Sequence, residues 1–128
     1  LSTNDVANPE TMHMPLHIAS IHGSSKVAMT LLKLGANANA RCRGGWTPLH
    51  ECSANGHATV AEALHSKGGA DLEARGDGGW TALHVCALNG SASCLPSLLA
   101  AGADAGAEEA DGRTAWALGK SLRFFDTF

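Results

Sequence analysis

The sequence predicts an all-α solenoid of antiparallel helix pairs with projecting β-hairpin loops. The first observation behind this prediction is a four-residue segment of the type Thr-Pro-Leu-His. It recurs, with substitutions, from Met14, Thr47, Thr81 and Thr114, at spacings of 33, 34 and 33 residues. The second is an apolar period of three to four residues after each copy, and the third is a glycine at the end of each periodic run. Self-similarity at this period is typical of units that bury their apolar faces by stacking on one another.

Each repeat should begin with a short helix. Thr47 and Thr81 stand where a hydroxyl can accept a hydrogen bond from the free N–H groups of a helix start. Pro48 follows at the first helical position, which needs no N–H donor. In the first repeat Met14 replaces the threonine, so the capping hydroxyl is missing there. We expect this helix to end at Gly23, Gly56 or Gly90, because glycine readily adopts the left-handed conformation that ends many helices.

A second helix should follow at once in each repeat. Pro96 would be costly deep inside a helix, so in the third repeat this helix should begin late, near Ser93. The end is expected at Gly35, Gly68 and Gly102, and glycines at 44–45, 78–79 and 112 then predict hairpin turns. The apolar residues of one buried face recur in register as Val27, Val60 and Cys94, then Ala28, Ala61 and Leu95, then Leu31, Leu64 and Leu98.

The repeats divide a single domain over residues 1–128. Residues 1–12 are interpreted as the tail of a preceding repeat or a cap. Repeat 1 then covers 13–45, repeat 2 covers 46–79, repeat 3 covers 80–112, and a partial fourth repeat covers 113–128. Because the fourth unit has a first helix and no second one, we expect the chain to be a piece of a longer protein.

Composition excludes several classes of partner. A net charge of −3 and an isoelectric point near 6.1 provide no basic field that would attract nucleic acid or an anionic membrane. No apolar run approaches the ~20 residues that a membrane helix needs, and the N-terminal stretch lacks the pattern of a secretory signal. We therefore expect a monomeric intracellular protein, cytoplasmic or nuclear, that binds neither nucleic acid nor membrane.

The four cysteines predict thiols rather than a disulfide framework. None belongs to a C-x-x-C motif, and Cys52 and Cys86 are one repeat apart, beyond the ~7 Å between Cα atoms that a disulfide tolerates. We expect Cys52, Cys86 and Cys94 to be buried and Cys42 to be accessible, because only Cys42 lies on a hairpin. Neighbouring arginines would lower the pKa of an exposed Cys42 thiol and make it redox-reactive, although an incidental surface cysteine is the simpler interpretation.

The tetrapeptide, the mid-repeat glycine, the Leu-Leu pair and a Gly-Ala-Asp/Asn tail together resemble the ankyrin repeat over roughly residues 12–125. The resemblance implies an L-shaped stack of helix pairs, hairpins at right angles to it, a concave face that binds protein partners, and no catalysis. It also implies a structural role for the tetrapeptide histidine, which bonds the threonine side chain and neighbouring backbone. The residues concerned are His17, Thr47, His50, Thr81 and His84.

The residue pattern predicts no catalytic, cofactor or metal site. His50 and Cys52, like His84 and Cys86, are two positions apart and point in different directions on a helix, whereas zinc needs four convergent donors. No glycine-rich phosphate loop is present, and no serine or cysteine has an identifiable His-Asp partner set.

The positions left free by the framework predict a protein-binding surface. Trp46 and Trp80 immediately precede the tetrapeptide, where the family's hairpins project toward the concave face, and we expect them to stack in parallel. Two interpretations remain open: each Trp covers the neighbouring hairpin, or each is an interface anchor. The full predicted set of partner contacts is His13, Ile21, His22, Arg41, Arg43, Trp46, Ala54, Asn55, Arg75, Asp77, Trp80, Leu88, Asn89, Asp111 and Arg113.

Two functional hypotheses follow from this surface. The first is a non-enzymatic scaffold module that binds a protein partner through the concave face and hairpin tips. The second is a regulatory or targeting segment of a larger, possibly enzymatic, protein. Two interpretations of the hairpin charges remain open: they form a solvated face, or the arginines of the first two hairpins and the acidic residues of the last one orient the partner.

Overall fold

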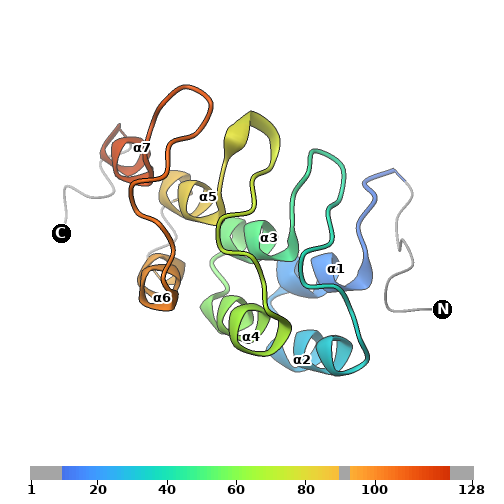
Figure 1. Ribbon diagram of the computed structural model, residues 1–128. Helices are drawn as coiled ribbons and strands as arrows, with labels where there is room; N and C mark the ends of the chain where they lie inside the picture. Colours follow the sequence, from blue (N-terminus) through green and yellow to red (C-terminus); the bar gives the residue numbers. More distant parts are fainter. Residues whose placement is uncertain (1–9, 90–92, 122–128) are drawn as a thin grey trace.

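The computed structural model describes residues 10–89 and 93–121. Figure 1 shows two rows of helices, with α1, α3, α5 and α7 in one and α2, α4 and α6 in the other, and long loops projecting from the stack. Within these residues, three helix pairs followed by a single helix confirm the predicted all-α solenoid. The elements are α1 (Pro15–His22), α2 (Ser25–Lys33), α3 (Pro48–Asn55), α4 (Ala58–Gly68), the 3-10 turn η1 (Asp77–Gly79), α5 (Ala82–Leu88), α6 (Cys94–Ala101) and α7 (Ala115–Ser121).

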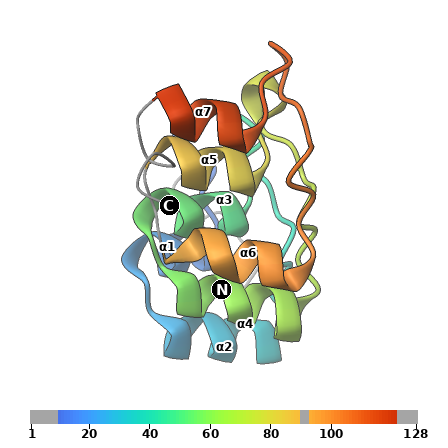
Figure 2. The ribbon, with the colours of Figure 1, turned by 90° about the vertical axis from the view of Figure 1, so that its left-hand side faces the viewer.

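The core lies between the two rows of helices. Along each row a helix packs on its counterpart in the next repeat, α1 on α3 on α5 on α7, and α2 on α4 on α6 (Figure 2). The tetrapeptide leucines Leu16, Leu49 and Leu83 are almost completely buried, as are Val60 and Leu64 of α4. Each such side chain contributes about 1.5–3 kcal/mol relative to exposure. Stacking of the repeats therefore provides the burial that holds the array together.

Most helix ends lie where the sequence predicts them. Gly23 (φ +79°) and Gly56 (φ +76°) follow α1 and α3 in the left-handed conformation, while Gly90 lies outside the described residues. α6 begins at Cys94 directly after Ser93, so Pro96 falls in its first turn, where no intrahelical N–H donor is needed. The extra residue of repeat 2 lengthens α4 through Gly68, and Gly69 (φ +66°) supplies the left-handed cap.

The helix starts show why threonine occupies the first tetrapeptide position. Thr47 Oγ1 accepts a hydrogen bond from the His50 N–H at 3.4 Å and is 2.8 Å from His50 Nδ1. Thr81 makes the same contacts with His84. At Met14 no side-chain cap is present, and only the backbone N–H donates to the ring of the tetrapeptide histidine.

The three hairpins, here called fingers 1, 2 and 3 (residues 41–46, 75–80 and 108–113), form one connected row. Each finger is closed at its base, for example by the Cys42 N–H donating to Trp46 O at 2.9 Å. Adjacent fingers are linked along the row, because Asp77 N–H donates to Gly44 O and Ala110 N–H donates to Gly78 O, both at 2.8 Å. The fingers therefore extend the stack as a continuous surface. Within the described helices, none is long and apolar enough to cross a membrane.

Candidate partner-binding surface

The tetrapeptide histidines fix the base of each finger to the preceding repeat. Nε2 of His17, His50 and His84 lies 3.0, 2.8 and 2.8 Å from the backbone oxygens of Trp46, Trp80 and Arg113, respectively. The other ring nitrogen, Nδ1, accepts a backbone N–H in each case, so Nε2 carries the proton that is donated to the carbonyl. These bonds set the position of the residue that immediately precedes each tetrapeptide.

Burial favours the neutral form of the His17 and His50 rings. His50 is only 2% exposed, and removal from water lowers its pKa to about 4, an effect that outweighs its bond to the Trp80 carbonyl. The pKa of His17 is lowered for the same reason. Neutral, fully bonded rings of this kind fit the structural role that the family resemblance implies.

Trp46 is half-buried between two fingers. A Cβ atom on Gly76 would lie 2.6 Å from Cε3 of the Trp46 ring, so the indole packs directly on the backbone of finger 2. The ring also meets the His50 ring edge-on, with centroids 5.0 Å apart, and Trp80 meets His84 at 6.0 Å. Each indole thus contacts the histidine of its own repeat. The expected stacking of Trp46 on Trp80 is not found among the ring contacts of the described residues. Trp46 both covers the neighbouring finger and retains exposed area.

Three hollows meet at Trp46. One of 180 Å³ lies against α3 and α5, where Trp46, Glu51, Ala54 and Val85 line it. A second of 310 Å³ has walls that include Trp46, Trp80 and Leu88. The third, of 360 Å³, lies on the side of finger 1. We call the combined lining of the three hollows the Trp46 groove. Its side chains include those of His13, Cys42, Arg43, Trp46, Glu51, Ala54, Asp77, Trp80, Val85, Leu88 and Asn89.

The structure brings together about half of the predicted contact residues. His13, Arg43, Trp46, Ala54, Asp77, Trp80, Leu88 and Asn89 line the groove. Ile21, His22, Arg41, Asn55, Arg75, Asp111 and Arg113 do not line it, and His22 belongs to a separate hollow beside α1 and α2. The predicted set of partner contacts lacks seven residues that line the groove, which are Glu10, Thr11, Cys42, Gly44, His50, Glu51 and Val85. Glu51 carried a usable signal, because it stands where the other repeats have Ile18 and Val85.

A further hollow, of 550 Å³, lies between α4 and α6 on the second-helix side of the stack. Its walls include Pro96 and Ser97 of α6 and His65 of α4. No tryptophan lines it, whereas two line the Trp46 groove, and tryptophan is enriched among interface anchors. The Trp46 groove is therefore the better candidate for binding a protein.

The predicted partner-binding arginines have bonds within the chain. Nη1 of Arg41 donates to Gly45 O in its own finger and to Arg75 O in finger 2, at 2.8 and 2.6 Å. Arg75, its equivalent in finger 2, donates in the same way to Gly79 O and to Glu108 O in finger 3, both at 2.7 Å. Each guanidinium thus joins two neighbouring fingers.

Finger 3 uses a buried carboxylate. Glu109 is 5% exposed, and its Oε1 accepts the backbone N–H groups of Asp111 and Arg113 at 2.9 and 2.8 Å. Its Oε2 accepts a bond from the Arg113 guanidinium at 2.9 Å. The hydrogen bonds from Arg113, side chain first and then backbone, lower the pKa of Glu109 to about 2. Glu109 therefore ties the two sides of finger 3 together in its ionised form.

The prediction of an accessible Cys42 is wrong. Cys42 is only 7% exposed, and its Sγ donates to Glu51 Oε1 at 3.7 Å and to Arg43 O at 3.6 Å. Burial, and then the charge of Glu51, raises the pKa of the Cys42 thiol, opposite to the lowering expected from neighbouring arginines. The side chain points from finger 1 toward α3 and away from solvent. Cys52, Cys86 and Cys94 are buried thiols outside any disulfide, as predicted.

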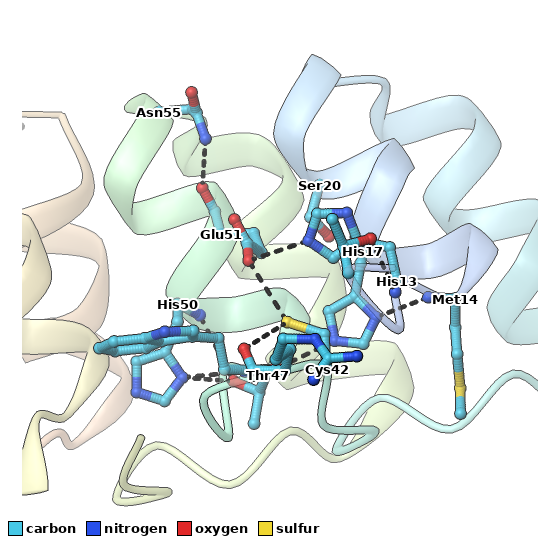
Figure 3. Close-up of polar contacts among 12 residues, drawn as sticks. His13, Met14, His17, Ser20, Cys42, Thr47, His50, Glu51 and Asn55 are labelled. Atoms are coloured by element: carbon cyan, nitrogen blue, oxygen red, sulfur yellow. Dashed lines mark hydrogen bonds and ion pairs between the residues drawn. The ribbon is translucent and has the colours of Figure 1, made fainter. Parts of the chain in front are cut away.

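Figure 3 shows that Glu51 lies between His13 and Cys42. One ligand atom from each of these three residues lies within 4.8 Å of the other two. The prediction of no metal rested on a lack of convergent ligands, and that premise is wrong for this cluster.

Comparison with known proteins gives the family of the chain. A family model described as ankyrin repeats (3 copies) matches residues 2–76, and another described as ankyrin repeats (many copies) matches residues 59–99. The chain is 38% identical over 52 residues to Rabankyrin-5 of Mus musculus, which covers 41% of this chain and 4% of that protein.

A second relative is protein phosphatase 1 regulatory subunit 27. The chain is 39% identical to the proteins of that name from Homo sapiens and from Mus musculus over 53 residues, which is 41% of this chain and 34% of each relative. The match thus covers about a third of that relative's length and a small fraction of Rabankyrin-5.

Proposed function

The chain belongs to the ankyrin repeat family, and on that premise we propose that it is a non-enzymatic module that binds another protein through the Trp46 groove. The observation that carries the proposal is the meeting of three hollows at one half-buried tryptophan. Interface anchors are large aromatic side chains seated among pockets that a partner can desolvate.

The groove is chemically mixed in a way that suits a protein segment. Trp46, Trp80 and Leu88 offer apolar area, and Leu88 is 41% exposed. Asp77 and Asn89 line the same hollow and supply polar groups at its edge. A partner with an apolar anchor flanked by polar or basic side chains would fit this lining.

A photo-crosslinking residue placed in the groove tests the proposal with little disturbance of the fold. Ala54 is exposed and lines the groove, whereas Ser66 lines the larger hollow between α4 and α6 and serves as the matched control. After irradiation in native extract, the Ala54 position should form a discrete protein adduct that Leu88→Asp abolishes. An adduct from Ser66 alone would move the binding site to the second-helix face.

The similarity to a phosphatase regulatory subunit favours one further candidate function, that of a segment that regulates or targets an enzyme. The direct test mixes the purified chain with the catalytic subunit of protein phosphatase 1 and measures binding and phosphatase activity. Saturable binding that Leu88→Asp weakens would support this candidate. An absence of binding at tens of micromolar would exclude that enzyme as the target.

A further inference from the structure

At the edge of the groove, three segments of the chain each bring one potential metal-ligand atom to the same place. His13 precedes α1, Cys42 lies on finger 1 and Glu51 lies on α3. His13 Nε2 is 3.6 Å from Glu51 Oε1, and Cys42 Sγ is 3.7 Å from the same oxygen. Figure 3 shows both contacts converging on the Glu51 carboxylate.

These distances are close to those within a tetrahedral zinc site. With zinc bonds of about 2.3 Å to sulfur and about 2.0–2.2 Å to nitrogen and oxygen, neighbouring ligand atoms lie ~3.3–3.6 Å apart. The separations of 3.6 and 3.7 Å would need to shorten by a few tenths of an ångström, and the ligand atoms of His13 and Cys42, which lie within 4.8 Å of each other, would close on the same ion. A thiolate and a carboxylate would together neutralise the two charges of the ion, and imidazole, thiolate and carboxylate are all zinc ligands.

We propose that His13 Nε2, Cys42 Sγ and a Glu51 carboxylate oxygen bind a Zn²⁺ ion with a fourth, open coordination position. The three residues line one hollow of 360 Å³, which would give the ion access and leave room for a water molecule or an incoming side chain. A zinc site with three protein ligands and one open position differs from a closed structural site with four. This proposal does not depend on the identity of any protein partner.

The ligand residues are held in place by bonds that the ion would not replace. The backbone N–H of Cys42 donates to Trp46 O at 2.9 Å, which fixes the start of finger 1. The His13 ring stacks on the His17 ring with centroids 5.6 Å apart. Glu51 lies on α3, and only 17% of its side-chain surface is exposed. Arg43 also lines the hollow, but its Nε is bonded to Glu10 O at 2.6 Å.

The test uses the tag-free chain, reduced and freed of metal with a chelator, and titrated with Zn²⁺ in a calorimeter. Co²⁺ is titrated in parallel because a cobalt–thiolate bond gives a charge-transfer absorption that reports sulfur as a ligand. Cys42→Ser, His13→Gln and Glu51→Gln each remove one ligand. His22→Gln and Glu62→Gln alter an exposed histidine and an exposed glutamate outside the cluster and are the matched controls.

We expect one equivalent of Zn²⁺ to bind the wild type and both controls and to raise their melting temperature. Changes to residues that only support the ligands typically weaken metal binding about 10–100-fold, and each ligand variant should weaken Zn²⁺ binding by more than that. Cys42→Ser should also abolish the charge-transfer band. If Cys42→Ser does not fold, the other two ligand variants decide the matter. The proposal is overturned if the folded wild type binds no stoichiometric Zn²⁺, if Co²⁺ gives no thiolate band, or if binding persists in His13→Gln and Glu51→Gln.

Discussion

At the scale of single residues, Cys42 shows how a contact between elements changes chemistry. A thiol between arginines on a hairpin suggests a reactive surface cysteine, but the side chain turns inward onto Glu51. Both burial and the carboxylate favour the protonated thiol, which is the unreactive form. The position of Glu51 on α3 relative to finger 1 depends on the packing of two repeats. The contact between Cys42 and Glu51 therefore could not be predicted from the residues around Cys42 alone.

This arrangement predicts slow labelling of every cysteine in the native protein. In metal-free chain at neutral pH, a thiol reagent should modify Cys42 at a small fraction of the rate seen after unfolding, because the thiolate is rare and shielded. Glu51→Gln should speed the reaction at Cys42 by removing one cause of the raised pKa. Immediate labelling of one equivalent in the folded wild type would contradict the buried geometry.

Glu109 predicts a specific dependence of stability on pH. Its pKa falls from 4.5 to about 2 on folding, so the folded state favours the ionised form. The stabilisation is therefore complete above pH 4.5 and is lost as the pH falls toward 2. Unfolding midpoints of the wild type and Glu109→Gln should differ clearly at pH 6 and converge near pH 2. Glu108→Gln, at an exposed neighbour, should show little difference at either pH, and equal effects of the two variants would count against the finger 3 network.

At the scale of elements, the helix starts were the most predictable features. The hydroxyl of Thr47, the proline after it and the glycine at the helix end act within a few residues, so their sequence pattern alone locates α3. The fingers were less predictable, because Arg41 and Arg75 bond to carbonyls of the next repeat. The sequence predicts that these arginines lie on the fingers, but it does not show that each one bonds to the backbone of the next finger.

The missing cap at Met14 gives a prediction for α1. Met14→Thr should restore the hydroxyl that Thr47 and Thr81 provide and raise the free energy of unfolding by about 1 kcal/mol. Denaturant titration of the wild type and the variant measures the change, and Thr47→Met provides the reverse substitution in a neighbouring repeat. A Met14→Thr variant that is no more stable than the wild type would show that another feature of repeat 1 compensates for the missing cap.

At the scale of the whole molecule, the repeat period predicted the stack, since copies that share a core pattern must pack in the same way. The groove was predicted only in part. Trp46, Trp80 and Leu88 were found one by one as variable positions, but the hollows that join them also require Glu51 and Val85, which belong to the repeated framework positions. A binding surface formed across repeats depends on how side chains from different repeats meet.

The measurement that most directly tests the central claim compares two exposed leucines, one from each row of helices. Leu88 (41% exposed) borders the Trp46 groove, and Leu99 (43% exposed) lies on α6. With the partner identified by crosslinking at Ala54, the dissociation constant is measured for Leu88→Asp and Leu99→Asp, each first shown to unfold like the wild type. We predict that Leu88→Asp weakens binding about 30-fold or more, equivalent to about 2 kcal/mol, while Leu99→Asp leaves it unchanged. If Leu88→Asp binds the partner as tightly as the wild type while Leu99→Asp binds it more weakly, the partner does not bind through the Trp46 groove.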